Sequence, residues 1–178
     1  RDDFPFFQAQ SDIVYLDNAA TTHKPQCVID CVMASLVNDN TNVHRSSYGL
    51  ASRVTSKFEK ARETVARFVQ ADDAQSIIWT KGATDSLNLF AQALQLEPSI
   101  LCGTEILLLE SEHHANLLPW QRLAQYLGLR ITYQNIDFSG GIDYSDRINK
   151  ITDETALVAF AHVSNALGCI LPVAELCA

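Results

Sequence analysis

The sequence has no apolar run of about 18 residues, so its residues form no membrane-spanning helix of the usual kind. Glycine (7) and proline (5) are too few among 178 residues for a linker-rich or collagen-like protein. Basic residues are also scarce: 13 Lys and Arg stand against 21 Asp and Glu, which gives a formal net charge of −8. A negative field repels phosphate groups. We therefore expect no nucleic-acid partner and no membrane partner.

Paired cysteine motifs are absent too. The five cysteines are scattered, and none forms a CxxC pair. Cys27 and Cys31 are four residues apart, but two thiols alone do not make a zinc site. An odd, scattered set is typical of reduced thiols acting as small buried hydrophobic residues. The sequence thus predicts a cytoplasmic protein without a metal site.

What the sequence does contain is a globular pattern, with 47% hydrophobic and 19% charged residues. Apolar residues recur at helical spacing from Leu50 to Phe68 and predict an amphipathic helix. Gly128 is placed to end a second helix, over residues 116–127. Further helices are expected from Pro25, over 84–96, over 144–151 and from Pro172, and strands over 77–79, 106–109, 129–136 and 156–161.

Strands and helices alternate along the chain, which indicates an α/β fold. The continuous apolar run from Ile106 to Leu109 is typical of a strand covered on both faces. We therefore predict a three-layer fold, with a mostly parallel sheet and helices on both faces. Ligands bind such sheets beyond the carboxyl ends of the strands. The loops over 80–84, 110–116 and 162–168 are the places to expect a site.

The first of these loops, Thr80–Ser86, connects a predicted strand to a predicted helix. Gly82 permits a tight turn, and N–H groups at a helix N-terminus attract anions. With the Thr84 hydroxyl they form a cup suited to a phosphate monoester. The loop lacks the GxxxxGK[ST] pattern, and Thr84 as a simple helix cap is the alternative.

The second loop, Glu110–Asn116, holds two adjacent histidines beside carboxylates. His113 and His114 suit metal binding, acid–base chemistry or stacking of an imidazole on a flat ring. Adjacent side chains diverge, and the HExxH spacing is absent. One histidine capping a helix and one in solvent is the alternative.

Two other loops carry single polar residues of interest. Asn165 offers a donor and an acceptor at a strand end, or forms an Asx turn. Arg45 suits a two-pronged contact with a carboxylate, or is a solvated surface charge. The three loops after successive strands together suggest a planar, phosphorylated ligand.

At this point the sequence resembles the cysteine desulfurase and selenocysteine lyase group of the class V aminotransferases, nearest its SufS-type and CSD-type branch. The resemblance runs from about Ile13 to the C-terminus and matches the N-terminal half of that group. It is carried by the segments Tyr15–Thr22, Asn42–Arg45, Lys81–Asn88, Glu112–Trp120 and His162–Gly168.

The resemblance implies a partial fold-type I large domain that binds pyridoxal 5′-phosphate. In that family the positions of Ala83 (through its backbone) and Thr84 hold the cofactor phosphate. The position of His113 stacks on the pyridine ring and assists proton transfer, which makes it the catalytic residue expected here. The position of Asn165 lies near the ring's phenolic oxygen and the substrate.

The resemblance also implies residues that bind the substrate. Ala20 falls in the segment over 1–24 that lines the active site, and His44 and Arg45 match positions near the dimer interface and the active-site mouth. Residues 25–178 correspond to an incomplete cofactor-binding domain, cut before the Schiff-base lysine. A homodimer is expected.

The activity implied is cleavage of cysteine, or of selenocysteine, to alanine and an enzyme-bound persulfide. A sulfur-acceptor protein and a role in iron–sulfur cluster assembly go with it. The Schiff-base lysine, the pyridine-pairing Asp and the nucleophilic loop cysteine of the family have no counterpart in these 178 residues. The chain alone is therefore expected to be inactive. Another class V aminotransferase-type enzyme and a non-catalytic half-fold binding module are the alternatives.

Overall fold

The computed structural model describes residues 1–134, 150–171 and 173–176. Its contacts divide the chain into two compact units, Arg1–Trp79 and Thr80–Ala178. No helix within the described ranges is long and apolar enough to cross a bilayer. The first unit contains helices α1 (Pro5–Ala9), α2 (Gln26–Asn38) and α3 (Gly49–Val69) and the 3₁₀ turn η1 (Ala74–Ser76).

In the first unit the predicted helices are confirmed. Helix α3 covers the predicted Leu50–Phe68 pattern, and α2 begins directly after Pro25. The carboxylate of Asp39, which ends α2, accepts hydrogen bonds from Arg53 and Lys57 of α3. Burial here is modest: α2 has no buried residue and Val32 is 53% exposed. Cys27 and Cys31, expected to be buried, are exposed on this helix.

The strand predicted at Ile77–Trp79 is wrong. The segment is extended but has no strand partner among the described residues, and Ile78 is 69% exposed. Its β-branched composition favours an extended backbone, but a strand also needs a neighbouring chain for its N–H and C=O groups.

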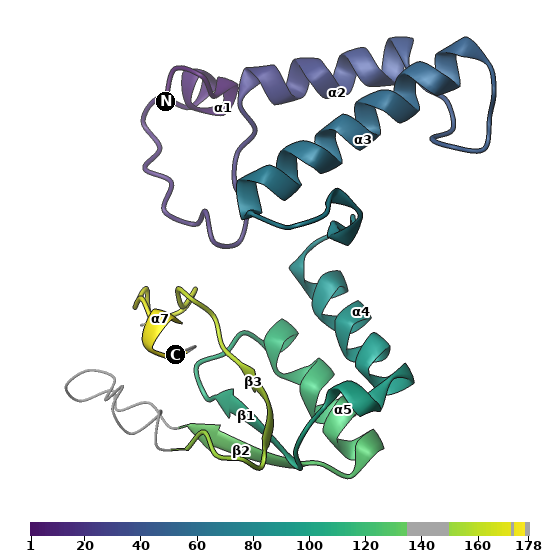
Figure 1. The fold of residues 1–178 in the computed structure, drawn as a ribbon. Coiled ribbons are helices and arrows are strands. Elements are labelled where there is room, and N and C mark those ends of the chain that lie inside the picture. Colours follow the sequence, from purple (N-terminus) through teal and green to yellow (C-terminus); the bar gives the residue numbers. More distant parts are fainter. Residues whose placement is uncertain (135–149, 172, 177–178) are drawn as a thin grey trace. The chain divides into compact units, whose positions relative to one another are not determined.

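The second unit is an α/β arrangement, with three strands in its described part (Figure 1). Strand β1 pairs in parallel with β2 on one side and with β3 on the other, so the order is β2-β1-β3. The elements are α4 (Ala83–Leu96), η2 (Pro98–Ile100), β1 (Glu105–Leu109), η3 (His114–Asn116), α5 (Leu118–Leu127), β2 (Arg130–Gln134), β3 (Thr155–Ala159) and α7 (Val173–Leu176).

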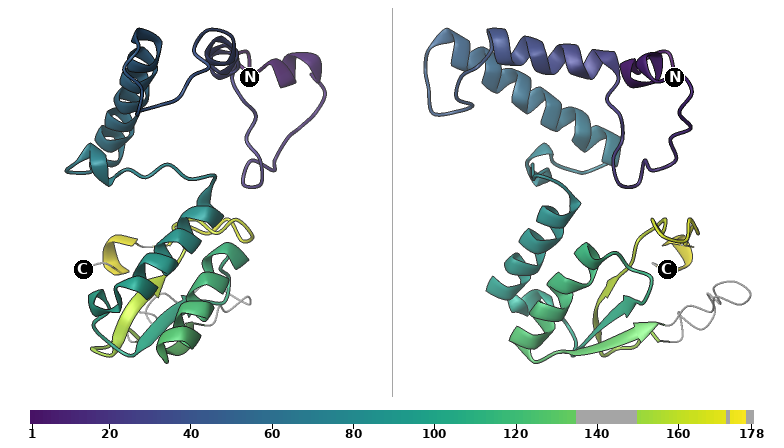
Figure 2. Two further views of the ribbon diagram at one scale, coloured as in Figure 1. Left: turned by 90° about the vertical axis from the view of Figure 1, so that its right-hand side faces the viewer. Right: turned by 180° about the vertical axis from the view of Figure 1, so that it is seen from behind.

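The core of this unit lies between the sheet and two helices. Ile106 and Leu108 of β1 have no exposed surface and pack with Leu94 of α4 and with Trp120 and Leu123 of α5. Figures 1 and 2 show the sheet between the α4–α5 pair and the short helix α7. The predicted parallel sheet with helices on both sides is confirmed. The short helix predicted over 144–151 lies mostly outside the described residues.

Two details of the second unit follow directly from residue type. All five residues of β1 are buried, as the continuous apolar run predicts for a central strand. Gly128 ends α5 with a left-handed φ of 72°, which a glycine adopts without strain.

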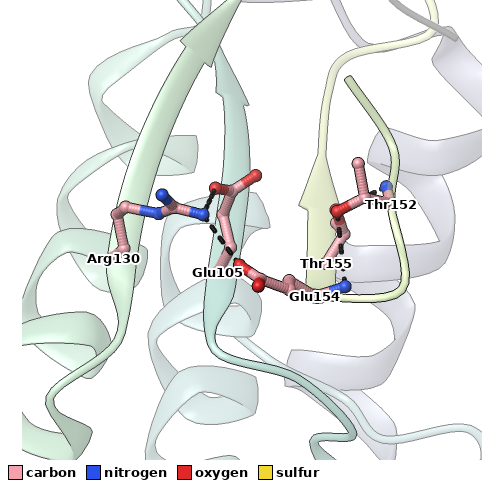
Figure 3. A network of polar contacts seen from close by, with 5 residues as sticks. All are labelled: Glu105, Arg130, Thr152, Glu154 and Thr155. Atoms are coloured by element: carbon pink, nitrogen blue, oxygen red, sulfur yellow. Dashed lines mark hydrogen bonds and ion pairs between the residues drawn. The ribbon is translucent and has the colours of Figure 1, made fainter. Parts of the chain in front are cut away.

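Ion pairs connect the amino ends of the strands. Arg130 of β2 places one guanidinium nitrogen 2.7 Å from the carboxylate of Glu105 and 3.0 Å from that of Glu154 (Figure 3). The Glu105 side chain is 7% exposed, whereas those of Arg130 and Glu154 are 64% and 65% exposed. This cluster neutralises a buried carboxylate at the edge opposite the predicted ligand loops.

Candidate functional site

The turn before α4 leaves backbone N–H groups open. Gly82 caps the helix with φ 154°, a conformation that residues with a Cβ rarely adopt. The first intrahelical bond runs from the N–H of Ser86 to the carbonyl of Gly82. The N–H groups of Ala83, Thr84 and Asp85 precede it and sit at the positive end of the helix dipole. This geometry can bind an anion.

Side chains hold that turn in shape. The hydroxyls of Thr80 and Ser86 lie 2.7 Å apart, in hydrogen-bond contact. The Asp85 carboxylate accepts the N–H of Lys81 at 3.1 Å. Asp85 therefore braces the loop rather than capping the free N–H groups of α4.

Thr84 and His113 line one cavity, with a volume of ≈ 530 Å³. His114 and Leu118 also contribute to its wall. Within the described part of the chain the Thr84 hydroxyl has no hydrogen-bond partner, so it can serve a ligand. The structure thus brings together the predicted phosphate-binding residue and the predicted ring-stacking residue.

His113 is oriented by its own backbone. Its Nδ1 accepts the N–H of Ala115 at 3.1 Å and so caps the turn η3. In the neutral imidazole the proton therefore sits on Nε2. The His113 and His114 rings are 6.3 Å apart and tilted by 59°. No group of three or more potential metal ligands occurs among the residues described.

A buried polar chain next to His113 was missed by the sequence analysis. Glu112 is 8% exposed, and its carboxylate accepts the N–H of Ala161 at 2.8 Å and the side-chain amide of Asn116 at 2.7 Å. The Asn116 oxygen in turn accepts the indole N–H of Trp120 at 2.9 Å. The i, i+4, i+8 spacing of Glu112, Asn116 and Trp120 was the available signal.

Asn165 does not line the cavity of Thr84 and His113. It lies exposed in a turn closed by a hydrogen bond from the N–H of Gly168 to the carbonyl of Ser164 at 2.9 Å. The buried Ser164 hydroxyl accepts the N–H of Leu167 and stabilises the same turn. The turn follows β3, so it starts from the same sheet edge as the His113 loop, which follows the parallel strand β1.

The remaining predicted site residues belong to the first unit. Ala20 sits in a loop whose ends are joined by the Tyr15 hydroxyl, which donates to the carbonyl of Thr21 at 2.6 Å. His44 and Arg45 both adopt left-handed backbone angles, with φ 60° and 54°, which side-chain-bearing residues seldom do. The His44 ring lies 3.1 Å from the Glu59 carboxylate.

The chain belongs to the aminotransferase class-V family, whose model matches residues 14–178. It is 41% identical over 176 residues to a probable cysteine desulfurase of Vibrio cholerae, covering 97% of this chain and 43% of that relative. A probable cysteine desulfurase of Synechocystis is 36% identical over 179 residues, covering 99% of this chain and 42% of that relative. The chain thus spans less than half the length of the curated relatives it matches.

Solved structures agree with the sequence matches. The apo structure of a cysteine desulfurase from Thermococcus onnurineus has a TM-score of 0.85 at 40% identity, over 99% of this chain and 42% of that one. The cysteine desulfurase CsdA of Escherichia coli has a TM-score of 0.80 at 35% identity, over 99% of this chain and 44% of that one. The predicted partial fold-type I domain is confirmed.

Enzymes of this family depend on pyridoxal 5′-phosphate, and the residues present fit that group. A phosphate suits the N–H groups at the start of α4 and the Thr84 hydroxyl, which have no partners among the described residues. A flat ring suits the imidazole of His113, which lines the same cavity.

Proposed function

We propose that this chain forms the cofactor-binding half of a pyridoxal-phosphate-dependent cysteine desulfurase. The observation that carries the proposal is the cavity between α4, η3 and α5, which Thr84 and His113 both line. The names of the relatives support cysteine as the substrate.

The residues divide into binding and catalytic roles. The backbone of Ala83 and the hydroxyl of Thr84 bind the cofactor phosphate. His113 stacks on the ring and, with its proton on Nε2, exchanges a proton with the reacting centre; the Nδ1 bond to Ala115 keeps the imidazole in that tautomer. Asn165 hydrogen-bonds near the cofactor ring and the substrate.

Residues of the first unit serve the substrate side. Ala20, in the segment over 1–24, and His44 and Arg45 are the residues we propose for binding the substrate. The guanidinium of Arg45 makes no hydrogen bond or ion pair with another side chain within the described ranges, so it suits a substrate carboxylate.

The bound cofactor supplies an electron sink for the carbanion next to the substrate amine. The C–S bond of cysteine breaks, its sulfur passes to an enzyme thiol as a persulfide, and the carbon skeleton leaves as alanine. The cysteines and lysines of this chain lack the family context for the thiol and the Schiff base. We propose that the protein is a homodimer in the cytoplasm. Its further partner is a sulfur-acceptor protein, and its role is in iron–sulfur cluster assembly.

The test is to incubate the intact, cofactor-loaded protein with cysteine and a thiol reductant, and to measure alanine and sulfide. Equal amounts of both are expected, and none from protein stripped of cofactor. Alanine-free transfer of the amino group to a keto acid would instead indicate an aminotransferase. A parallel reaction with selenocysteine ranks the two substrates.

A second test separates this chain from the intact protein. The 178-residue chain is mixed with pyridoxal phosphate, treated with borohydride and digested for mass spectrometry. We expect no adduct at one preferred lysine. A single reduced lysine would show that this chain holds its own covalent anchor.

A further inference from the structure

The buried carboxylate of Glu112 joins two loops that are far apart in the sequence. One oxygen bonds the backbone N–H of Ala161, 49 residues away, just after β3. The other bonds the Asn116 side chain in η3. Both partners are neutral N–H donors, and no ion pair to Glu112 occurs among the described residues.

The chain of bonds has a fixed direction. A carboxylate only accepts, so Asn116 must turn its NH₂ group toward Glu112. Its oxygen then faces Trp120 and accepts the indole N–H, which can only donate. Reversing any one member leaves a buried donor facing a donor, or an acceptor facing an acceptor, which is costly in a low-dielectric interior.

The network reaches both sides of the candidate site. Glu112 directly precedes His113, and Asn116 ends the turn that His113 caps. Ala161 begins the segment that leads to Asn165. Trp120, 2% exposed, anchors the other end of the network in the core, where its ring meets Phe90 edge-on.

We propose that Glu112 is a positioning residue, which holds the His113 loop and the loop after β3 in the relative placement that the cofactor ring requires. The inference rests on the proposed function for its link to the cofactor. The donor–acceptor chain itself stands on the geometry alone.

A charge relocation tests the proposal in the intact protein. Glu112→Gln places an NH₂ group against Asn116, and Asn116→Asp places a second carboxylate against Glu112. The double variant restores every bond, because the introduced amide accepts from Ala161 and donates to the introduced carboxylate, which still accepts from Trp120. Side-chain volume and network charge are those of the original pair. Glu110→Gln, an exposed neighbour, is the control.

Two readouts are measured for each variant. The first is the dissociation constant of pyridoxal phosphate, and the second is the indole N–H resonance of Trp120 by NMR, assigned by its loss in Trp120→Phe. We expect each single variant to weaken cofactor binding at least about tenfold and to shift the resonance. The double variant should return affinity to within about threefold, in line with coupling of neighbouring groups, and Glu110→Gln should change neither.

The outcomes are separable. A double variant no better than the singles, or too unstable to fold, would overturn the donor–acceptor chain. Single variants that shift the Trp120 resonance but bind the cofactor normally would overturn the positioning role. A protein that produces no alanine from cysteine, yet shows rescue of cofactor affinity, would contradict the proposed reaction while supporting the role of Glu112.

Discussion

The two edges of the sheet each bury a carboxylate, and they satisfy it in opposite ways. At the amino edge Glu105, 6% exposed, pairs with the cation of Arg130, which also reaches Glu154 (Figure 3). At the carboxyl edge Glu112 is 8% exposed, and its partners among the described residues are neutral N–H groups. The amino edge is thus closed by charge neutralisation, and the carboxyl edge by directional hydrogen bonds.

This difference suggests that the amino edge serves the stability of the fold and that the carboxyl edge serves ligand binding. At the amino edge the charge of Arg130 is already balanced by the carboxylates of Glu105 and Glu154. Neutral donors around Glu112 shape two loops, while the N–H groups that begin α4 and the Thr84 hydroxyl stay open. We therefore expect substitutions at the amino edge to change unfolding alone, and those at the carboxyl edge to change cofactor affinity.

The largest effect should come from Gly103→Ala at the amino edge. A Cβ there would lie 2.5 Å from the carbonyl oxygen of Glu154 and 2.8 Å from the nitrogen of Ala156, and φ is 149°. That carbonyl accepts the N–H groups of Thr104 and Glu105, so it has no room to move freely. Strain and overpacking predict a loss of about 3 kcal/mol in the free energy of unfolding, measured by urea denaturation.

Gly128→Ala is the matched control for Gly103. It also has a positive φ, of 72°, but no atom lies within 4 Å of an added Cβ. Only the left-handed backbone is penalised, by about 1 kcal/mol. Equal losses at the two glycines would show that the contact with Glu154 does not hold the amino edge.

The next effect is expected for Arg130→Met, which leaves the buried Glu105 carboxylate without its cation. Removing one partner of a fully buried pair costs about 3–5 kcal/mol. Arg130 is 64% exposed, so water shares in solvating the site and about 2 kcal/mol is expected. Adding Glu105→Leu should regain most of the loss, and cofactor affinity should stay unchanged in both variants. Urea denaturation and cofactor titration measure the two quantities.

A smaller effect is expected for Thr84→Ala at the carboxyl edge. This variant should change cofactor affinity and leave the free energy of unfolding nearly unchanged. Losing one hydroxyl contact to a phosphate predicts about tenfold weaker pyridoxal phosphate binding, or about 1.4 kcal/mol. The free energy of unfolding without cofactor should hardly change, because Thr84 is exposed. Ser99→Ala, an exposed hydroxyl elsewhere in the unit, is the control. If Thr84→Ala lowers the free energy of unfolding but leaves cofactor affinity unchanged, the proposed phosphate-binding role of Thr84 is contradicted.

The sequence predicted the elements whose signal is local. The apolar run at Ile106–Leu109 indicated a buried strand, the spacing from Leu50 indicated α3, and Gly128 indicated a helix end. It failed at Ile77–Trp79, where extended propensity is local but strand pairing is not.

In the candidate site, too, the sequence predicted the features with a local signal and missed those without one. Thr84 and His113 share a cavity, although the strand expected before the Thr84 loop is absent from the described residues. The bond from Glu112 to Ala161 spans 49 residues and involves a backbone N–H, which carries no residue-type signal. No spacing rule reveals such a partner. Asn165 in its exposed turn remains a prediction.

The smallest effect is expected at Asp39, a third buried carboxylate, which lies in the first unit. Unlike Glu105 and Glu112, Asp39 is paired with two cations. Hydrogen bonds from Lys57 and then Arg53 lower the pKa of Asp39 below its ordinary value of 3.8. A lowered folded-state pKa stabilises the fold above the unfolded value, and this stabilisation is lost as pH falls through the folded value. Both cations are more than half exposed, so the effect is weak and screened by salt.

Asp39→Asn should therefore unfold more easily than the original protein at about pH 7, and the gap should close below pH 3.8. High salt should narrow the gap at neutral pH, whereas Glu112→Gln should be insensitive to salt because its partners are neutral. Asp72→Asn, exposed and without a partner in the described ranges, is the control. A salt-independent Asp39 effect would mean that geometry, rather than charge, decides how this fold satisfies a buried carboxylate.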